Sequence, residues 1–212
     1  MAEDNVERRG FTGDVEVREE NGEVRITGYA AMFDSDSVLL PGGFIETIRP
    51  NAFTDVLAKP ETDPVALWNH NADYPLGRRS SGTLKVWEDY RGLRYSVLMP
   101  KSAERIVEAV RRRDVTGSSF AFTVSPSDET FERNDEDGIP RRRIRRVSSL
   151  LDVAIVLHPA YPSTSAAVRM RAADFLNIET EPQVDEAPAT AGPVVSPFAS
   201  KAGNVANWLR RV

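Results

Sequence analysis

Three residue types in this chain could together carry out acyl transfer. His70, one of only two histidines, ends the short apolar run Ala66-Leu67-Trp68-Asn69-His70, where a predicted strand meets a loop. Ser119 follows on a second predicted strand, and Asp152 interrupts a third strand that is otherwise apolar. A base, a nucleophile and a buried acid on three strands form a serine-hydrolase constellation if the fold brings them together.

The pattern around Ser119 separates it from its neighbour Ser118. Successive residues of a strand face opposite ways, so the aromatic residues mark the core face, and Ser118 shares that face. Ser119 lies on the other face, where small residues leave room for a substrate chain, and we take it as the nucleophile. Spacing alone leaves open that both serines are ordinary strand residues. The core face carries Phe120, Phe122 and Val124, and the other face carries Gly117, Ser119, Ala121 and Thr123.

Asp152 is the predicted third member, and it has two alternatives. An acid among Leu150–Leu157 is costly to bury without a partner, and orienting the imidazole of His70 would supply one. In the structural alternative, Asp152 forms a salt bridge to an arginine of the run 141–146. His158 is the rival third member, but it lies roughly 20 Å from Asp152 along an extended strand, so at most one of the two contacts His70.

Composition excludes several kinds of chemistry. The chain has 212 residues, no cysteine and a formal net charge of -5. Disulfides, thiolate catalysis and cysteine-zinc sites are therefore excluded. We expect no cofactor or metal, because the two histidines are predicted on different strands. The acidic N-terminal residues are wrong for a secretory signal, and no apolar run reaches the ~18 residues of a membrane span.

The elements that must position these residues are mostly strands. Asn21-Gly22 predicts a tight hairpin turn, and Ser102 is the predicted cap of a helix over 103–113. The arginine run 141–146 is either a solvated strand edge or a docking patch for an acidic partner, with protein ranked above nucleic acid. The predicted strands are 14–33 (a hairpin), 65–69, 83–98 (a hairpin), 118–124 and 144–157, with a short helix ending at Leu57 and a closing helix over 166–178.

Taken together, several stretches resemble the prohead proteases of tailed phages, the serine peptidases of capsid maturation. The resemblance covers roughly residues 11–170 in the expected order, and it implies His70 as base and Ser119 as nucleophile. The family's acidic position usually holds Glu, where this chain has Asp152. The matching stretches are Gly28–Phe33, Pro50–Phe53, Trp68–His70, Gly82–Leu84 with Gly92–Leu93, Gly117–Phe122, Asp152–Val156 and Pro159–Thr164.

The resemblance also implies a fold and a role. The family is similar to the herpesvirus assembly protease, so we expect an α+β fold: a closed or nearly closed, antiparallel-rich β-barrel with a few surrounding helices. In that relative the third catalytic residue is a second histidine, so His158 stays an alternative to Asp152 as the third residue. We expect residues 1–178 to form the protease domain, 179–200 a disordered Pro/Ala-rich linker and 201–212 a short tail segment.

By resemblance, the chain is a serine endopeptidase inside the immature phage head, in the host cytoplasm. Its expected partners are the major capsid protein with its scaffolding segment, and itself, through self-cleavage and self-association. No membrane is expected, and nucleic acid is ranked below protein as a partner. The alternative functions are a catalytically inactive assembly or scaffolding protein that keeps the barrel, and a small-molecule esterase.

Overall fold

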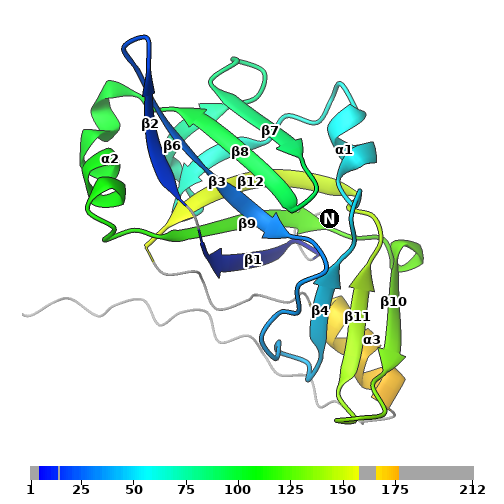
Figure 1. The fold of residues 1–212 in the computed structure, drawn as a ribbon. Helices are drawn as coiled ribbons and strands as arrows, with labels where there is room; N and C mark the ends of the chain where they lie inside the picture. The colour runs from blue at the N-terminus through cyan, green and yellow to red at the C-terminus, as the bar shows by residue number, and fades with distance from the viewer. Residues whose placement is uncertain (1–4, 14, 158–165, 177–212) are drawn as a thin grey trace, which may run out of the picture. The chain divides into compact units, whose positions relative to one another are not determined.

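The computed structural model describes residues 5–13, 15–157 and 166–176, and most of them lie in or between strands (Figure 1). The strands are β1 (Glu7–Thr12), β2 (Glu16–Glu20), β3 (Glu23–Met32), β4 (Ile45–Ile48), β5 (Val65–Trp68), β6 (Asn71–Arg78), β7 (Leu84–Glu88), β8 (Gly92–Leu98), β9 (Gly117–Thr123), β10 (Glu129–Arg133), β11 (Pro140–Ile144) and β12 (Ser149–Val156). The helices are α1 (Thr54–Ala58), α2 (Glu104–Arg111) and α3 (Ala166–Leu176), with 3₁₀ turns at Lys101–Ala103 and Pro126–Asp128.

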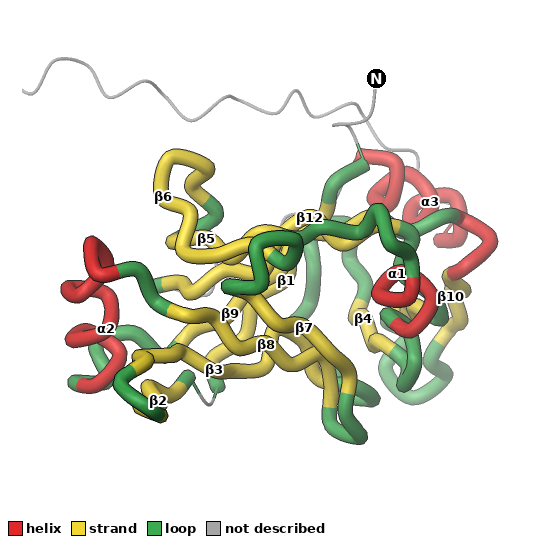
Figure 2. Tube along the Cα trace, turned by 90° about the horizontal axis from the view of Figure 1, so that it is seen from above, coloured by secondary structure: helices red, strands yellow, loops and turns green. Residues whose placement is uncertain are grey.

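These strands form three sheets. The first has the order β1-β9-β12-β5-β6, the second β2-β3-β8-β7 and the third β10-β11-β4. Most neighbours are antiparallel, but β5 pairs in parallel with β12, and β4 with β11. In Figure 1 β3 crosses over β9, so the four-stranded sheet lies against the five-stranded one. Figure 2 shows α2 and α3 at opposite ends of this arrangement.

The core lies between the four-stranded and the five-stranded sheet. The four-stranded sheet contributes Ile26, Tyr95 and Val97, and the five-stranded sheet contributes Phe120 and Phe122. All five side chains are buried in one continuous cluster. The rings of Phe120 and Phe122 stack with their centroids 4.7 Å apart. Burial of these large side chains is the main force that holds the two sheets together.

The prediction of an α+β fold built on a closed or nearly closed β-barrel is wrong, because the described residues are mostly strand, with few helices. A barrel requires its first and last strands to pair, whereas in the described residues all three sheets are open. The five-stranded sheet ends at β1 and β6, and Pro75 in β6 has no backbone N–H to offer a further strand. Alternation of apolar and polar residues defines the two faces of a strand, and it is the same in a barrel and in stacked open sheets. The sequence pattern therefore could not decide closure.

Several predicted elements are confirmed. Asn21 and Gly22, with φ of 54° and 78°, make the turn between β2 and β3. The second hairpin, β7–β8, and the strand of Ser119 are also present. Ser102 does not cap α2, since it lies in the 3₁₀ turn before the helix, whose N-cap is Ala103 without a side-chain cap. The strands β1, β4, β6, β10 and β11 were not predicted from the sequence pattern.

The C-terminal part is described only through α3. This helix confirms most of the predicted closing helix, and its Val168 and Ala172 pack against Leu40 and Phe44. The predicted linker 179–200 and tail 201–212 lie outside the described residues. In the part of the chain that the structure describes, no helix is long and apolar enough to cross a membrane.

Candidate active site

Ser119 lies on β9, in the interior of the five-stranded sheet. Its neighbours across the sheet are Gly10 on β1 and Ala154 on β12. The predicted alternation along β9 holds: Phe120 and Phe122 enter the core, and Ser119 faces the opposite side. Ser118 also faces the core, where its hydroxyl lies 2.8 Å from the hydroxyl of Tyr95. Burial raises the pKa of Tyr95 to about 12, and the hydrogen bond with Ser118 offsets part of the rise.

Asp152 lies on β12, beside the strand of Ser119. A β-bulge at Leu151 separates the pair Leu150–Phe122 from the pair Asp152–Ala121. The extra residue turns Leu151 out to 41% exposure, while Leu150 is buried in the core. Beyond the bulge Asp152 shares its face with Ala154 and, across β9, with Ser119.

His70 lies in the two-residue turn between β5 and β6. Asn69 and His70 have φ of 51° and 56°, so both adopt the left-handed conformation of a type I′ hairpin turn. The β5–β6 hairpin lies beside β12 in Figure 2. The turn therefore brings the imidazole over the sheet face that carries Ser119 and Asp152.

The three predicted residues form one hydrogen-bonded chain. Nε2 of His70 lies 2.6 Å from Oγ of Ser119, and Nδ1 lies 2.7 Å from Oδ1 of Asp152. The His70 and Asp152 side chains are only 9% and 11% exposed. In a neutral ring, the carboxylate of Asp152 favours the tautomer that carries its proton on Nδ1. Nε2 is then an acceptor that faces the serine hydroxyl, which is the geometry of a general base and its nucleophile.

The hydroxyl of Ser119 has a second acceptor within reach. Its Oγ lies 2.8 Å from the backbone carbonyl oxygen of Arg9 on β1, and Ser119 itself is fully buried. One hydroxyl proton can be donated to only one of Nε2 and the carbonyl at a time. The strand β1, which was not predicted from the sequence, therefore takes part in orienting the Ser119 hydroxyl.

The alternatives for Asp152 differ in outcome. The salt bridge to the arginine run 141–146 does not form, because each arginine of that run has other partners. Arg142 pairs with a buried cluster of glutamates. The partners of the others are Asp137 for Arg141, Glu132 for Arg143, the backbone carbonyl of Ser127 for Arg145, and Asp55 and Asp128 for Arg146. His158 lies outside the described residues. Within the described chain, no group of His, Asp and Glu is placed to hold a metal ion.

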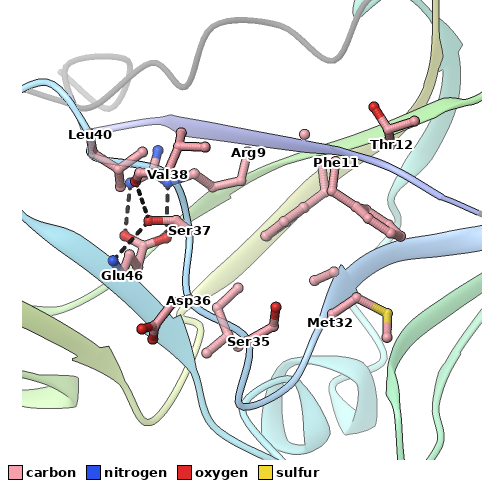
Figure 3. A pocket seen from close by; sticks show the side chains of 15 residues that line it. Arg9, Phe11, Thr12, Met32, Ser35, Asp36, Ser37, Val38, Leu40 and Glu46 are labelled. Atoms are coloured by element: carbon pink, nitrogen blue, oxygen red, sulfur yellow. Dashed lines mark hydrogen bonds and ion pairs between the residues drawn. The ribbon is translucent and has the colours of Figure 1, made fainter.

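A separate cavity of about 430 Å³ lies beside β1 (Figure 3). It is lined by Arg9 and Phe11 of β1, by Met32 and by the segment 35–40, and its wall includes the core-facing Phe120. Figure 3 shows Arg9 joined to Glu46 at its edge. No side chain of the Ser119–His70–Asp152 chain lines this cavity. The cavity and the hydrogen-bonded chain therefore lie on opposite faces of the sheet.

Comparison with known proteins gives one match. A protein-family model described as caudovirus prohead serine protease matches residues 13–178, which include all three residues of the hydrogen-bonded chain. None of the curated proteins and none of the solved structures matches this chain.

Proposed function

The chain belongs to the family of caudovirus prohead serine proteases, and from this premise we propose that it cuts the major capsid protein and its scaffolding segment during head maturation. Membership of this family identifies the chain as a serine protease of phage capsid maturation. We propose further that it acts as an endopeptidase inside the immature head, in the host cytoplasm. Its proposed partners are the capsid protein, the scaffolding segment and a second copy of itself.

The proposed mechanism uses the three hydrogen-bonded residues. Ser119 attacks the scissile carbonyl carbon while Nε2 of His70 takes the hydroxyl proton. The tetrahedral intermediate collapses as His70 returns that proton to the leaving amine, and the acyl group stays on Ser119. Water, activated by His70 in the same way, then releases the acid and restores the serine. Asp152 holds the imidazole in the required tautomer and stabilises its charged form.

One observation supports this assignment above the others. Both ring nitrogens of His70 have partners at hydrogen-bond distance, 2.6 Å to Ser119 and 2.7 Å to Asp152. A histidine with only a structural role would not need a hydroxyl on one side and a carboxylate on the other. The same contacts favour Asp152 over His158 as the third residue, because the Nδ1 position is already taken by the carboxylate.

The test is co-expression with the capsid protein of the same phage. We expect the wild-type chain to shorten the capsid protein, as read by intact mass, and Ser119→Ala and His70→Ala to leave it at full length. Ser118→Ala is the matched control, because its hydroxyl faces Tyr95 in the core; it should still process. Processing by Ser119→Ala at the wild-type rate would overturn the assignment, and an unprocessed capsid protein in every case would favour a non-enzymatic assembly protein.

Self-cleavage is a further part of the proposal. We place it in the segment 179–200, whose Pro- and Ala-rich composition suits an exposed linker after a protease domain of residues 1–178. The same mass measurement, made on the protease, should show loss of the C-terminal part in the wild type and not in Ser119→Ala. A wild-type chain that stays at full length while it cuts the capsid protein would contradict this part alone.

A further inference from the structure

The turn that carries His70 is conformationally strained. Type I′ turns favour Asn followed by Gly, because both central residues have positive φ. Here the second central residue is His70, with φ of 56°. A non-glycine residue in the left-handed region costs about 1–2 kcal/mol. Such a conformation persists only when its surroundings hold it, so a specific anchor is needed to keep the imidazole in place.

Asn69 supplies that anchor through two hydrogen bonds to the end of β12. Its backbone N–H donates to the carbonyl of Ile155 at 3.0 Å. Its side-chain Oδ1 accepts from the backbone N–H of Leu157, also at 3.0 Å. These contacts continue the parallel pairing of β5 with β12 beyond its last paired residues, Trp68 and Ile155. They attach the turn to the same strand that carries Asp152.

Asn69 suits this place for two physical reasons. Asn tolerates the left-handed conformation better than most residues with a side chain. Its short amide also offers an acceptor that reaches the N–H of Leu157, a group just beyond the end of β12. A glycine at position 69 would fit the turn but would leave that N–H without its acceptor. An alanine would lose both advantages.

We propose that Asn69 is a positioning residue for the base: it clamps the His70 turn to β12, so that one rigid frame holds the imidazole between Asp152 and Ser119. This inference rests on the proposed function for its catalytic consequence, but the geometry stands by itself. Asn69 contacts neither Ser119 nor Asp152 and acts through the position of His70.

The first test measures the reactivity of Ser119 with a fluorophosphonate probe. In that reaction the serine oxygen bonds to phosphorus, fluoride leaves, and His70 takes the hydroxyl proton. Displacing a catalytic group by about 1 Å can cost about a hundredfold. We expect Asn69→Ala and Asn69→Gly to lower the labelling rate about tenfold to a hundredfold. Asn69→Asp, which keeps an acceptor oxygen and tolerates the turn, should stay within about threefold of wild type.

Asn71 is the matched control. It is the same residue type, on the other side of His70 in the same hairpin, and among the described residues its side chain accepts a local hydrogen bond from the N–H of Asp73. We expect Asn71→Ala to label at the wild-type rate. Melting temperatures are measured for all four variants, because a purely structural role for Asn69 would lower the melting temperature without changing the labelling rate of the folded protein.

The second test does not depend on activity. The chain has two histidines, so ¹⁵N-labelled imidazoles give a simple proton NMR spectrum. The proton on Nδ1 of His70 is hydrogen-bonded to the carboxylate of Asp152. It should therefore give a strongly downfield signal in wild type, Asn69→Asp and Asn71→Ala. That signal should broaden or move upfield in Asn69→Ala and Asn69→Gly.

The outcomes separate this inference from the proposed function. Equal labelling and an unchanged His70 signal in Asn69→Ala and wild type would overturn the role of Asn69. The same holds if Asn69→Ala and Asn71→Ala lose reactivity equally. A wild-type protein that neither labels nor cuts the capsid protein would instead count against the proposed protease, and the NMR signal would still decide whether Asn69 positions His70.

Discussion

At the scale of single residues, the proposed mechanism depends on where the proton of the Ser119 hydroxyl goes. Two acceptors compete for it, Nε2 of His70 and the Arg9 carbonyl. Attack on a substrate requires the proton to go to Nε2, because only the imidazole can carry it on to the leaving group. Asp152 favours this state, since it holds the other imidazole proton on Nδ1.

Replacing Asp152 by Asn tests this role. The amide can donate to Nδ1, which places the ring proton on Nε2 and removes the acceptor for Ser119. We expect Asp152→Asn to lower the turnover number by about a thousandfold to ten-thousandfold while the fold is retained. The measurement is the initial rate of capsid-protein cleavage together with a circular dichroism spectrum.

Asp152→Glu is the companion variant. It keeps the carboxylate with one more methylene, so it should retain more activity than Asp152→Asn. A normal rate in Asp152→Asn would move the third role to His158, and His158→Ala would then have to abolish cleavage.

Much of the candidate site could be predicted at this scale. Strand alternation separated Ser119 from Ser118, because the aromatic residues Phe120 and Phe122 define the core face of β9. Apolar flanks marked Asp152 as an acid in need of a partner. The role of Asn69 could not be predicted in the same way, because it depends on a turn conformation and on contacts with β12, which lies far along the chain.

At the scale of elements, a buried ionic cluster joins β1 to the three-stranded sheet. Arg142 on β11 is fully buried and pairs with Glu7 of β1, Glu46 of β4 and Glu129 of β10. Arg9 of β1 pairs with Glu7 and Glu46. The carbonyl of Arg9 is the group that reaches Ser119. The cluster therefore fixes the strand that lies beside Ser119.

Removal of Arg142 should destabilise the fold. Arg142→Met leaves the carboxylates of Glu7, Glu46 and Glu129 buried with less compensation, and breaking a buried ion pair in this way costs about 3–5 kcal/mol. Denaturant unfolding should show this loss in the free energy of unfolding. Arg143→Met, one position along β11, removes a half-exposed side chain and should change that free energy by less than about 0.5 kcal/mol. Equal effects of the two substitutions would contradict the structural role of the cluster.

The same cluster predicts sensitivity to acid. Burial alone would raise the pKa of Glu46, but the guanidinium groups of Arg9 and Arg142 outweigh it and hold that pKa below its ordinary value of 4.5. A carboxyl group with a lowered folded-state pKa stabilises the fold above its unfolded pKa, and this stabilisation is lost as pH falls through the folded-state pKa. The loss attributable to Glu46 therefore begins below about pH 4.5.

Comparison with Glu46→Gln isolates this effect. The wild type should be more stable than the variant near neutral pH, and the difference in their free energies of unfolding should shrink as pH falls below about 4.5. Denaturant unfolding at a series of pH values measures both. A difference that stays constant down to about pH 3 would show that Glu46 does not titrate as the ion pairs require.

The arginine run shows the limit of sequence patterns at this scale. Its composition predicts a solvated edge or a docking patch, and for the buried Arg142 neither holds. Alternation along β11 turns Arg141 and Arg143 outward and Arg142 inward, so one arginine of the run is a core residue. Its three glutamate partners come from three other strands, and no local pattern in the sequence connects them. The bulge at Leu151 was missed for a similar reason: one added residue reverses the faces of a strand without any signal in composition.

At the scale of the whole molecule, two open sheets packed on a shared core place the three residues together. β9 and β12 are direct neighbours, and β5 extends the sheet on the far side of β12. The turn after β5 places the His70 ring within hydrogen-bond distance of side chains on both strands. A rigid sheet holds a catalytic group more accurately than a loop can, and here two of the three residues lie on paired strands and the third on a tight turn.

The sequence indicated a β-rich chain and most of the strands around the site, but not how the sheets end. Closure depends on whether edge strands such as β1 and β6 find partners, and alternation carries no information on this. The resemblance to a known family selected three residues that the structure brings within hydrogen-bond distance, because its matching stretches contain the residues themselves. It predicted the closed barrel wrongly because no matching stretch reports on sheet closure.

The identity of the nucleophile is the central claim, and the position of a covalent label tests it most directly. The protein is treated with a fluorophosphonate, digested and examined by tandem mass spectrometry, in parallel with His70→Ala. We predict one adduct, on Ser119, and its loss in His70→Ala. An adduct on Ser118 or on any other residue, or labelling of Ser119 that is unaffected by the loss of His70, would contradict the account.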